Sequence, residues 1–292
     1  MTASSAAAGQ SIDKSGWVVG KVLAERARRS PQRPFLQFQD GRPYTFGEIH
    51  GIATRMGNGF LALGVQQGER VAVMMPNSLD YVWSWLGLSL IGAVTVGINT
   101  AYKGSFLSHV LNNVGCGIVI MHPDYLPWLA DIEDELPQVK LAIVPAMDAY
   151  QGKLPRFKRI RMLPLEPLLN AAETPIEIEV TYRDIGMILF TSGTTGPSKG
   201  VLMSHAHLYL FGLLTSRHTR MTPDDRMYIC MPLFHGMGLL LQLYNCLITG
   251  CYAILVPIFS ASSWVQDIRR YKATVTFALG AITEFILRQP PL

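Results

Sequence analysis

The chain has 292 residues, of which 49% are hydrophobic and 16% are charged, with a formal net charge of +4. This length and apolar content can bury a substantial core, which argues against an extended disordered protein. The net charge is too mild to indicate a nucleic-acid partner. We interpret the one basic run, residues 153–161, as a solvated linker, with a binding site for an anion or RNA as the alternative. Four cysteines without metal-site spacing predict buried, reduced thiols of a cytosolic protein: Cys116, Cys230, Cys246 and Cys251.

The first part of the chain predicts a tail, a helix and a hairpin. Residues 1–16 are expected to be disordered, because they are rich in Ala, Ser and Gly and lack the regions of a signal peptide. Apolar residues at helical spacing predict an amphipathic helix over residues 18–29. The pair Asp40-Gly41 predicts a hairpin turn. Thr45 and Glu48 have the spacing of a capping box that begins the next helix.

Two long stretches without charged residues, 81–102 and 227–266, raise the question of a membrane span. A span needs roughly 20 apolar residues in one helix. Glycines, prolines and β-branched clusters instead divide both stretches into shorter elements. Strands are predicted over residues 70–75, 93–98, 117–121, 141–144, 184–190, 228–231 and 252–256, and helices over 79–91 and 239–248. Asn77 and Ser78, just before the first of these helices, are predicted as helix caps. This alternation predicts an α/β fold with buried parallel strands and no transmembrane segment.

Residues 151–175 are rich in proline and basic side chains and form the best linker candidate. The predicted organisation is therefore a first α/β subdomain over residues 17–150 and a second over residues 176–292. The second subdomain would carry the most unusual loop of the chain.

That loop, residues 191–201 (TSGTTGPSKGV), brings hydroxyl groups, glycines and one lysine together directly after a predicted strand. Glycine lets the backbone approach a ligand, and backbone N–H groups, hydroxyls and a lysine bind phosphate. The pattern is not a Walker A loop, because the second glycine and the final hydroxyl are missing and a strand follows in place of a helix. We interpret the loop as a phosphate-binding site, with a flexible surface hairpin as the alternative.

The same stretch resembles the phosphate-loop signature of the adenylate-forming, or AMP-binding, enzymes, in the acyl-CoA synthetase branch. Other segments resemble this family in the same order: YTFGEIH at residues 44–50, MPNSLDYVWSWLGLSLIGAVTVGIN at 75–99, and MPLFHGMG at 231–238. The stretch 279–291 is most similar to crotonobetaine/carnitine–CoA ligases and fatty-acid ligases. The resemblance implies the N-terminal part of that fold, with layered mixed sheets flanked by helices.

The resemblance also implies a reaction. A carboxylic acid would attack ATP to give an acyl-adenylate and pyrophosphate, and coenzyme A would then form a thioester. The loop residues would hold the phosphates: Thr191, Ser192, Gly193, Thr194, Thr195 and Gly196. Lys199 would neutralise charge as pyrophosphate leaves, and Thr195 would contact Mg²⁺.

A second group of residues would serve the acid. His235, Gly236 and Met237 are expected near the substrate carboxylate, with a core histidine as the alternative for His235. His205 is interpreted mainly as structural. Tyr244, Leu241 and Met237 are equally compatible with the acyl pocket and with the core.

The family motifs for adenine, ribose and the C-terminal lysine do not occur in this sequence. The sequence analysis therefore predicts an N-terminal fragment that is inactive alone. The alternatives are a non-catalytic nucleotide-binding or interaction protein, and an adenylation domain that loads a carrier-protein thiol. A cytoplasmic location is expected, and a homodimer is compatible with the resemblance.

Overall fold

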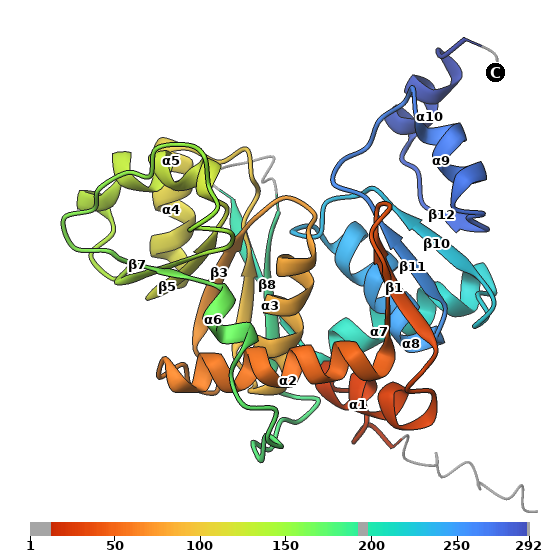
Figure 1. The fold of residues 1–292 in the computed structure, drawn as a ribbon, viewed down its shortest axis with the longest axis horizontal. Helices are drawn as coiled ribbons and strands as arrows, with labels where there is room; N and C mark the ends of the chain where they lie inside the picture. Colours follow the sequence, from red (N-terminus) through yellow and green to blue (C-terminus); the bar gives the residue numbers. More distant parts are fainter. Residues whose placement is uncertain (1–12, 192–197, 291–292) are drawn as a thin grey trace, which may run out of the picture.

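The computed structural model describes residues 13–191 and 198–290 and contains two β-sheets with helices between and around them (Figure 1). The larger sheet has the order β7-β6-β5-β3-β4-β8-β9 and is parallel except for the β8–β9 hairpin. Its strands are β3 (Arg70–Met74), β4 (Val94–Gly97), β5 (Ile118–Met121), β6 (Leu141–Val144), β7 (Arg161–Pro164), β8 (Ile185–Thr191) and β9 (Lys199–Ser204). The predicted α/β class is confirmed.

The smaller sheet has the order β12-β10-β11-β1-β2, and only the β1–β2 hairpin is antiparallel. Its strands are β1 (Pro34–Phe38), β2 (Pro43–Thr45), β10 (Arg226–Ile229), β11 (Tyr252–Leu255) and β12 (Val275–Thr276). The hairpin around Asp40-Gly41 is therefore present as predicted.

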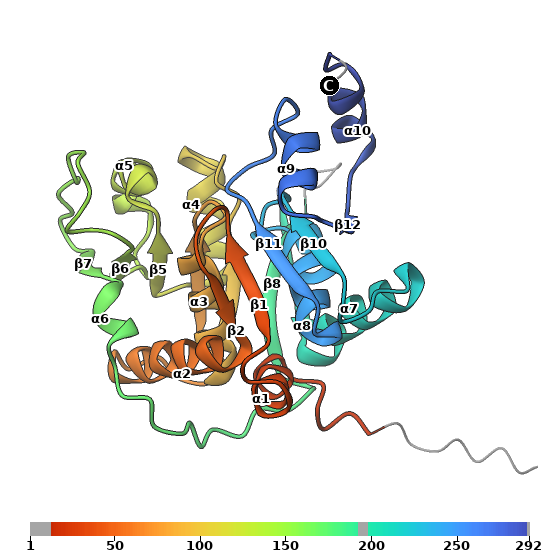
Figure 2. The same cartoon turned by 45° about the vertical axis from the view of Figure 1, so that its right-hand side comes forward.

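The helices fill the space between the sheets and cover their outer faces (Figure 2). They are α1 (Val19–Arg29), α2 (Phe46–Ala62), α3 (Leu79–Leu90), α4 (Gly104–Val114), α5 (Leu126–Asp131), α6 (Glu166–Leu169), α7 (His205–Thr219), α8 (Asn245–Thr249), α9 (Trp264–Arg270) and α10 (Gly280–Leu287). Two short 3₁₀ turns, η1 (Pro123–Tyr125) and η2 (Glu133–Glu135), and a π-helix, η3 (Met237–Tyr244), complete the elements.

Alternating side chains of the strands divide the core into layers. In β3, Val71 and Val73 belong to the cluster between the two sheets, whereas Ala72 and Met74 pack in the cluster under α4 and α5. This is the period of two that a strand buried on both faces must show. The smaller sheet likewise carries a separate cluster on its outer face, which includes Tyr228 and Tyr271.

The uncharged stretches of the sequence are explained by this layering. Every residue from Tyr81 to Ser89 in α3 is buried, because the helix lies between the two sheets (Figure 1). Within the described parts of the chain, no helix has the combination of length and apolar character that crossing a bilayer requires.

Capping residues near the first turn determine where helices α2 and α3 begin. The Thr45 hydroxyl accepts a hydrogen bond from the Glu48 backbone N–H (3.3 Å), and a Glu48 carboxylate oxygen accepts one from the Thr45 N–H (2.7 Å). The capping box is thus confirmed. Ser78 caps α3 by accepting from the Tyr81 N–H (3.2 Å). Its neighbour Asn77 was also predicted as a cap, but its side chain bonds to the other sheet.

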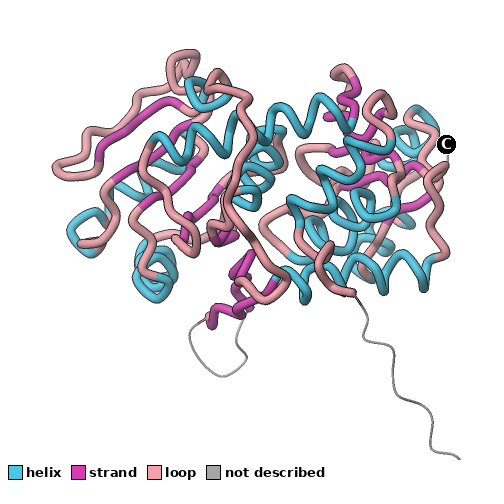
Figure 3. The backbone as a smooth tube through the Cα atoms, turned by 90° about the horizontal axis from the view of Figure 1, so that it is seen from below, coloured by secondary structure: helices cyan, strands magenta, loops and turns pink. Residues whose placement is uncertain are grey.

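The sheets do not follow the predicted division of the chain. Each sheet takes strands from both sides of residues 151–175, since β1 pairs with β11 and β4 pairs with β8. Part of the predicted linker is itself a strand, β7, at the edge of the larger sheet. Two connections without helix or strand lie on either side of β7 and α6: residues 145–160, which include the first part of the predicted linker, and residues 170–184, which cross the underside of the molecule (Figure 3).

The predicted helix over residues 239–248 is corrected by the structure. It begins two residues earlier, and residues 237–244 form the π-helix η3 before α8 continues the chain. Gly238 explains the tight start, because a Cβ atom there would lie only 2.4 Å from the Pro232 carbonyl oxygen and 2.5 Å from that of Met231. All four cysteines are free and buried, as predicted.

Candidate active site

A cavity of about 450 Å³ lies at the carboxyl ends of β4 and β8, between these strands, β9, α7 and η3. Ligands of open parallel sheets bind at this edge of the strands. Its apolar wall consists of Leu189, Phe190, Val201, Met203, Phe211, Phe234 and Leu240, together with the ring of Tyr102. Its polar groups are Asn99, Thr191, His207 and His235, and no Asp, Glu, Lys or Arg is among the described lining residues.

Glycine permits the cavity to form where β4 ends. A Cβ atom on Gly97 would lie 2.8 Å from the carbonyl oxygen of Phe234. Contacts this short do not occur for real Cβ atoms, so the segment that carries His235 can approach β4 only because residue 97 has no side chain. The sequence predicted the strand here but not this contact.

His235 is exposed and lines the cavity together with Gly236. Its Nδ1 accepts a hydrogen bond from the Met237 backbone N–H (3.2 Å). In the neutral ring, the hydrogen therefore resides on Nε2, because the two nitrogens of a neutral imidazole take opposite roles. The ring thus presents an N–H donor of the kind that binds a carboxylate or a carbonyl oxygen.

The two ends of the glycine-rich loop lie beside the cavity. Thr191 ends β8 and is the register partner of Lys199, the first residue of β9. Thr191 lines the cavity, and Lys199 is exposed. Five loop residues that were predicted to bind phosphate, one of them also predicted to contact Mg²⁺, lie outside the described residues: Ser192, Gly193, Thr194, Thr195 and Gly196.

Two side chains that the sequence analysis did not identify anchor the end of this loop. The Tyr102 hydroxyl is 3.2 Å from the Ser198 hydroxyl, and Nε2 of His109 is 3.4 Å from the Ser198 carbonyl oxygen. Tyr102 precedes α4 and His109 lies within it, and this helix was not predicted. Tyr102 and His109 are far from the loop in the sequence, so no local sequence pattern indicated that they contact it.

The remaining predicted residues are not among the described residues that line the cavity. Met237 contributes its backbone N–H, but its side chain is not in the lining. Tyr244 is fully buried and packs edge-on against Trp85, with ring centroids 5.8 Å apart. His205 is fully buried, and its Nδ1 accepts a hydrogen bond from the Val19 N–H (3.4 Å). Burial lowers the pKa of His205 to about 4, against a smaller opposing effect of Asp184, so the ring is neutral at physiological pH.

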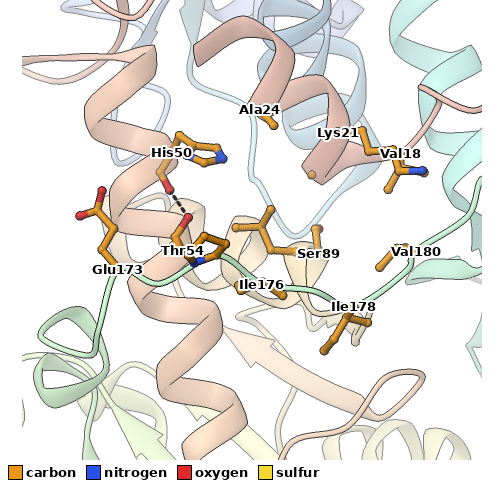
Figure 4. A pocket seen from close by; sticks show the side chains of 13 residues that line it. Val18, Lys21, Ala24, His50, Thr54, Ser89, Glu173, Ile176, Ile178 and Val180 are labelled. Atoms are coloured by element: carbon orange, nitrogen blue, oxygen red, sulfur yellow. Dashed lines mark hydrogen bonds between the residues drawn. The ribbon is translucent and has the colours of Figure 1, made fainter. Parts of the chain in front are cut away.

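A second cavity, of about 390 Å³, lies between α1, α2, α3 and the 170–184 connection (Figure 4). Ser89 lies in its wall at the end of α3, shortly before β4 begins, so this cavity faces the opposite edge of the sheet. The Ser89 hydroxyl donates to the Trp85 carbonyl oxygen (2.7 Å) and that of Thr54 donates to the His50 carbonyl oxygen (2.8 Å). None of the predicted site residues reaches it, so the cavity at His235 is the candidate active site.

The comparison with known protein families agrees with this geometry. The family model described as AMP-binding enzyme matches residues 23–292. The chain belongs to the AMP-binding enzyme family. The resemblance predicted from the loop and from the segments around residues 44–50, 75–99 and 231–238 is therefore confirmed.

The relatives of this chain include a ligase and transport proteins. Long-chain fatty acid transport protein 2 of Rattus norvegicus is 28% identical over 274 residues, which cover 92% of this chain and 43% of the relative. Crotonobetaine/carnitine–CoA ligase of Proteus mirabilis (strain HI4320) is 28% identical over 253 residues, 85% of this chain and 48% of the ligase. The chain thus spans about half the length of the curated relatives it matches.

Solved structures support the same assignment. The inhibitor-bound N-terminal domain of FACL13 from Mycobacterium tuberculosis is similar with a TM-score of 0.83 at 26% identity, and the match covers 94% of this chain and 65% of that chain. The predicted fold, the N-terminal part of the adenylate-forming enzyme fold with layered mixed sheets flanked by helices, is therefore confirmed.

Proposed function

We propose that this chain is part of an ATP-dependent acyl-CoA ligase. In the first step of the proposed reaction, a carboxylate and ATP give an acyl-adenylate and pyrophosphate. In the second step, coenzyme A displaces AMP from the acyl-adenylate to give the thioester. One observation carries the proposal. Thr191, at the start of the phosphate-loop sequence, and His235, whose Nε2 N–H has no acceptor among the described residues, line the same apolar cavity. This arrangement supports the proposal of an anion-binding loop beside a pocket for an organic acid. The cytoplasm is the proposed location, in keeping with four free thiols.

The residues at the site fit the phosphates of ATP. Lys199 brings a positive charge to the loop, and Thr191 lies opposite it in the hairpin. Mg²⁺ is held mainly by phosphate oxygens and water, with few protein ligands. The lack of a cluster of three His, Cys, Asp or Glu residues in the described parts of the chain therefore agrees with metal held through the nucleotide. When bound, Mg²⁺ would neutralise phosphate charge, and Thr195 is its proposed protein contact.

His235 and the cavity wall are proposed to select the acid. The Nε2 hydrogen would bind the carboxylate, while the aromatic and aliphatic side chains would surround its tail. No Lys or Arg is among the described lining residues, so a second carboxylate buried against the apolar wall would be poorly solvated and without a cation in contact. The proposed substrates are therefore monocarboxylic acids with an apolar tail.

This acid selection can be tested on the chain itself. We expect hexanoate or benzoate to bind at least about tenfold more tightly than glutarate in isothermal titration calorimetry. Phe211→Ala should weaken binding of the preferred acid about three- to tenfold, because a wall of the cavity is removed.

Leu214→Ala is the matched control for Phe211→Ala. Leu214 lies on the same helix and is similarly exposed, 47% against 40%, but it does not line the cavity. Equal affinities for glutarate and hexanoate, or equal effects of the two variants, would contradict the assignment of the cavity to the acid.

A further inference from the structure

Asn77 connects the two sheets at the edge where the candidate active site lies. It is in the turn between β3 and α3, with 4% of its surface exposed. Its Nδ2 donates to the carbonyl oxygens of Met231 and Val256, each at 3.0 Å, and its Oδ1 accepts from the Leu233 N–H at 2.8 Å. Both amide hydrogens and the amide oxygen are therefore used.

All three partners lie beyond the carboxyl ends of strands in the other sheet. Met231 and Leu233 follow β10, and Val256 follows β11. Backbone groups at strand ends have no further ladder partner, and a buried group without a partner is unfavourable. A side chain from the larger sheet thus satisfies three backbone groups that the smaller sheet leaves open.

The segment held in this way carries His235. Its backbone forms a turn after Leu233, in which the His235 N–H donates to the Pro232 carbonyl oxygen (3.1 Å). On the other side, the Phe234 carbonyl oxygen rests against Gly97. The segment is therefore fixed between Asn77 and β4. The position of its backbone determines where the His235 imidazole lies in the cavity.

We propose that Asn77 is a positioning residue for His235. It fixes the 231–235 segment, and thereby sets where the imidazole Nε2 lies relative to the bound acid. The inference rests on the proposed function only in taking His235 as a contact of the acid. A purely structural role would hold the sheets together without affecting the imidazole in the folded protein.

The first test measures the imidazole directly, by NMR of the His235 ring C–H group, assigned by comparison with His235→Gln. Asn77→Ser keeps a hydroxyl that can satisfy one carbonyl oxygen, and Asn77→Ala removes all three bonds. We expect the His235 resonance to shift and broaden in both folded variants, and more in Asn77→Ala. Should Asn77→Ala fail to fold, Asn77→Ser decides the result.

Asn58→Ala is the matched control. The Asn58 side chain also donates to two backbone carbonyl oxygens, those of Ala172 (2.8 Å) and Thr174 (2.9 Å), on the 170–184 connection. This change should leave the His235 resonance in place. An unchanged His235 resonance in folded Asn77→Ser, or the same shift in Asn58→Ala, would overturn the proposal.

The second test is a double-mutant cycle on acid affinity. Asn77→Ser should weaken binding of the preferred acid about five- to tenfold in the wild-type background and less than about twofold in His235→Ala. Equal losses in both backgrounds would show that Asn77 does not act through His235. If the wild-type chain binds no acid, the proposed function fails, while the NMR comparison still decides the role of Asn77.

Discussion

Replacing Lys199 with alanine is expected to weaken pyrophosphate binding about 10- to 100-fold, because hydrogen bonds to a charged group contribute about 1.5–3 kcal/mol. Lys199 is exposed at the start of β9, so the free energy of unfolding should change by less than about 0.5 kcal/mol. Titration calorimetry gives the affinity, and urea unfolding gives the stability.

The control for this prediction is Lys21→Ala. Lys21 is an exposed lysine of α1 that lines the second cavity, at the opposite edge of the sheet (Figure 4). Lys21→Ala changes the net charge by the same amount as Lys199→Ala. Comparing the two variants therefore distinguishes local phosphate binding by Lys199 from a general electrostatic effect. Pyrophosphate affinity that is equal in Lys199→Ala and the wild type would show that the loop does not bind phosphate.

Replacing Glu133 with alanine is expected to destabilise the protein by about 2–4 kcal/mol, since a buried carboxylate and its hydrogen bonds are lost. Glu133 is only 4% exposed and accepts from the backbone N–H groups of Lys158 (2.8 Å), Arg159 (2.7 Å) and Ile160 (3.0 Å). These bonds hold the segment that leads into β7. Urea unfolding measures the loss.

The Glu133 carboxylate is also expected to make the stability of the folded protein depend on pH. Burial alone raises the pKa of Glu133, but the three backbone hydrogen bonds outweigh it, and the pKa in the folded protein is lowered. The contribution of the Glu133 carboxylate to stability is therefore complete above its pKa in the unfolded chain, about 4.3. This contribution is lost as the pH falls through the lower pKa of Glu133 in the folded protein. Glu133→Gln should lack this acid-dependent loss.

Asp134→Ala serves as the matched control for Glu133→Ala. Asp134 is adjacent and pairs with Lys158, but both side chains are more than two-thirds exposed, at 72% and 71%. Such a pair contributes little, so a change below about 1 kcal/mol is expected. Similar losses for Glu133→Ala and Asp134→Ala would contradict the anchoring role of Glu133.

Local signals in the sequence were sufficient for most elements of the fold. The capping box at Thr45 and the continuous apolar run of β3 are recognisable from neighbouring residues in the chain. The division into subdomains was not predictable in this way, because β1 pairs with β11 across more than half of the chain. Periodicity likewise could not distinguish the π-helix η3 from an α-helix.

The sequence predicted the motifs of the candidate site, but not the residues that hold these motifs in position. Thr191 and His235 were identified from their own sequence segments, and the structure places both at one cavity. Asn77 was predicted as a helix cap, which is the local role of such a residue before a helix. Its hydrogen bonds to residues 231, 233 and 256 depend on how the sheets are placed, so its sequence neighbours could not indicate them.

The most direct test of the central claim is acid-dependent exchange of labelled pyrophosphate into ATP. The assay should be run on this chain and on the complete reading frame that contains it, with monocarboxylic and dicarboxylic acids. We predict exchange with an apolar monocarboxylic acid by the product of the complete reading frame, and its loss in Lys199→Ala. A folded product of the complete reading frame that shows no exchange with any acid would contradict the proposed activity of an adenylate-forming ligase, whereas no exchange is expected from this chain alone.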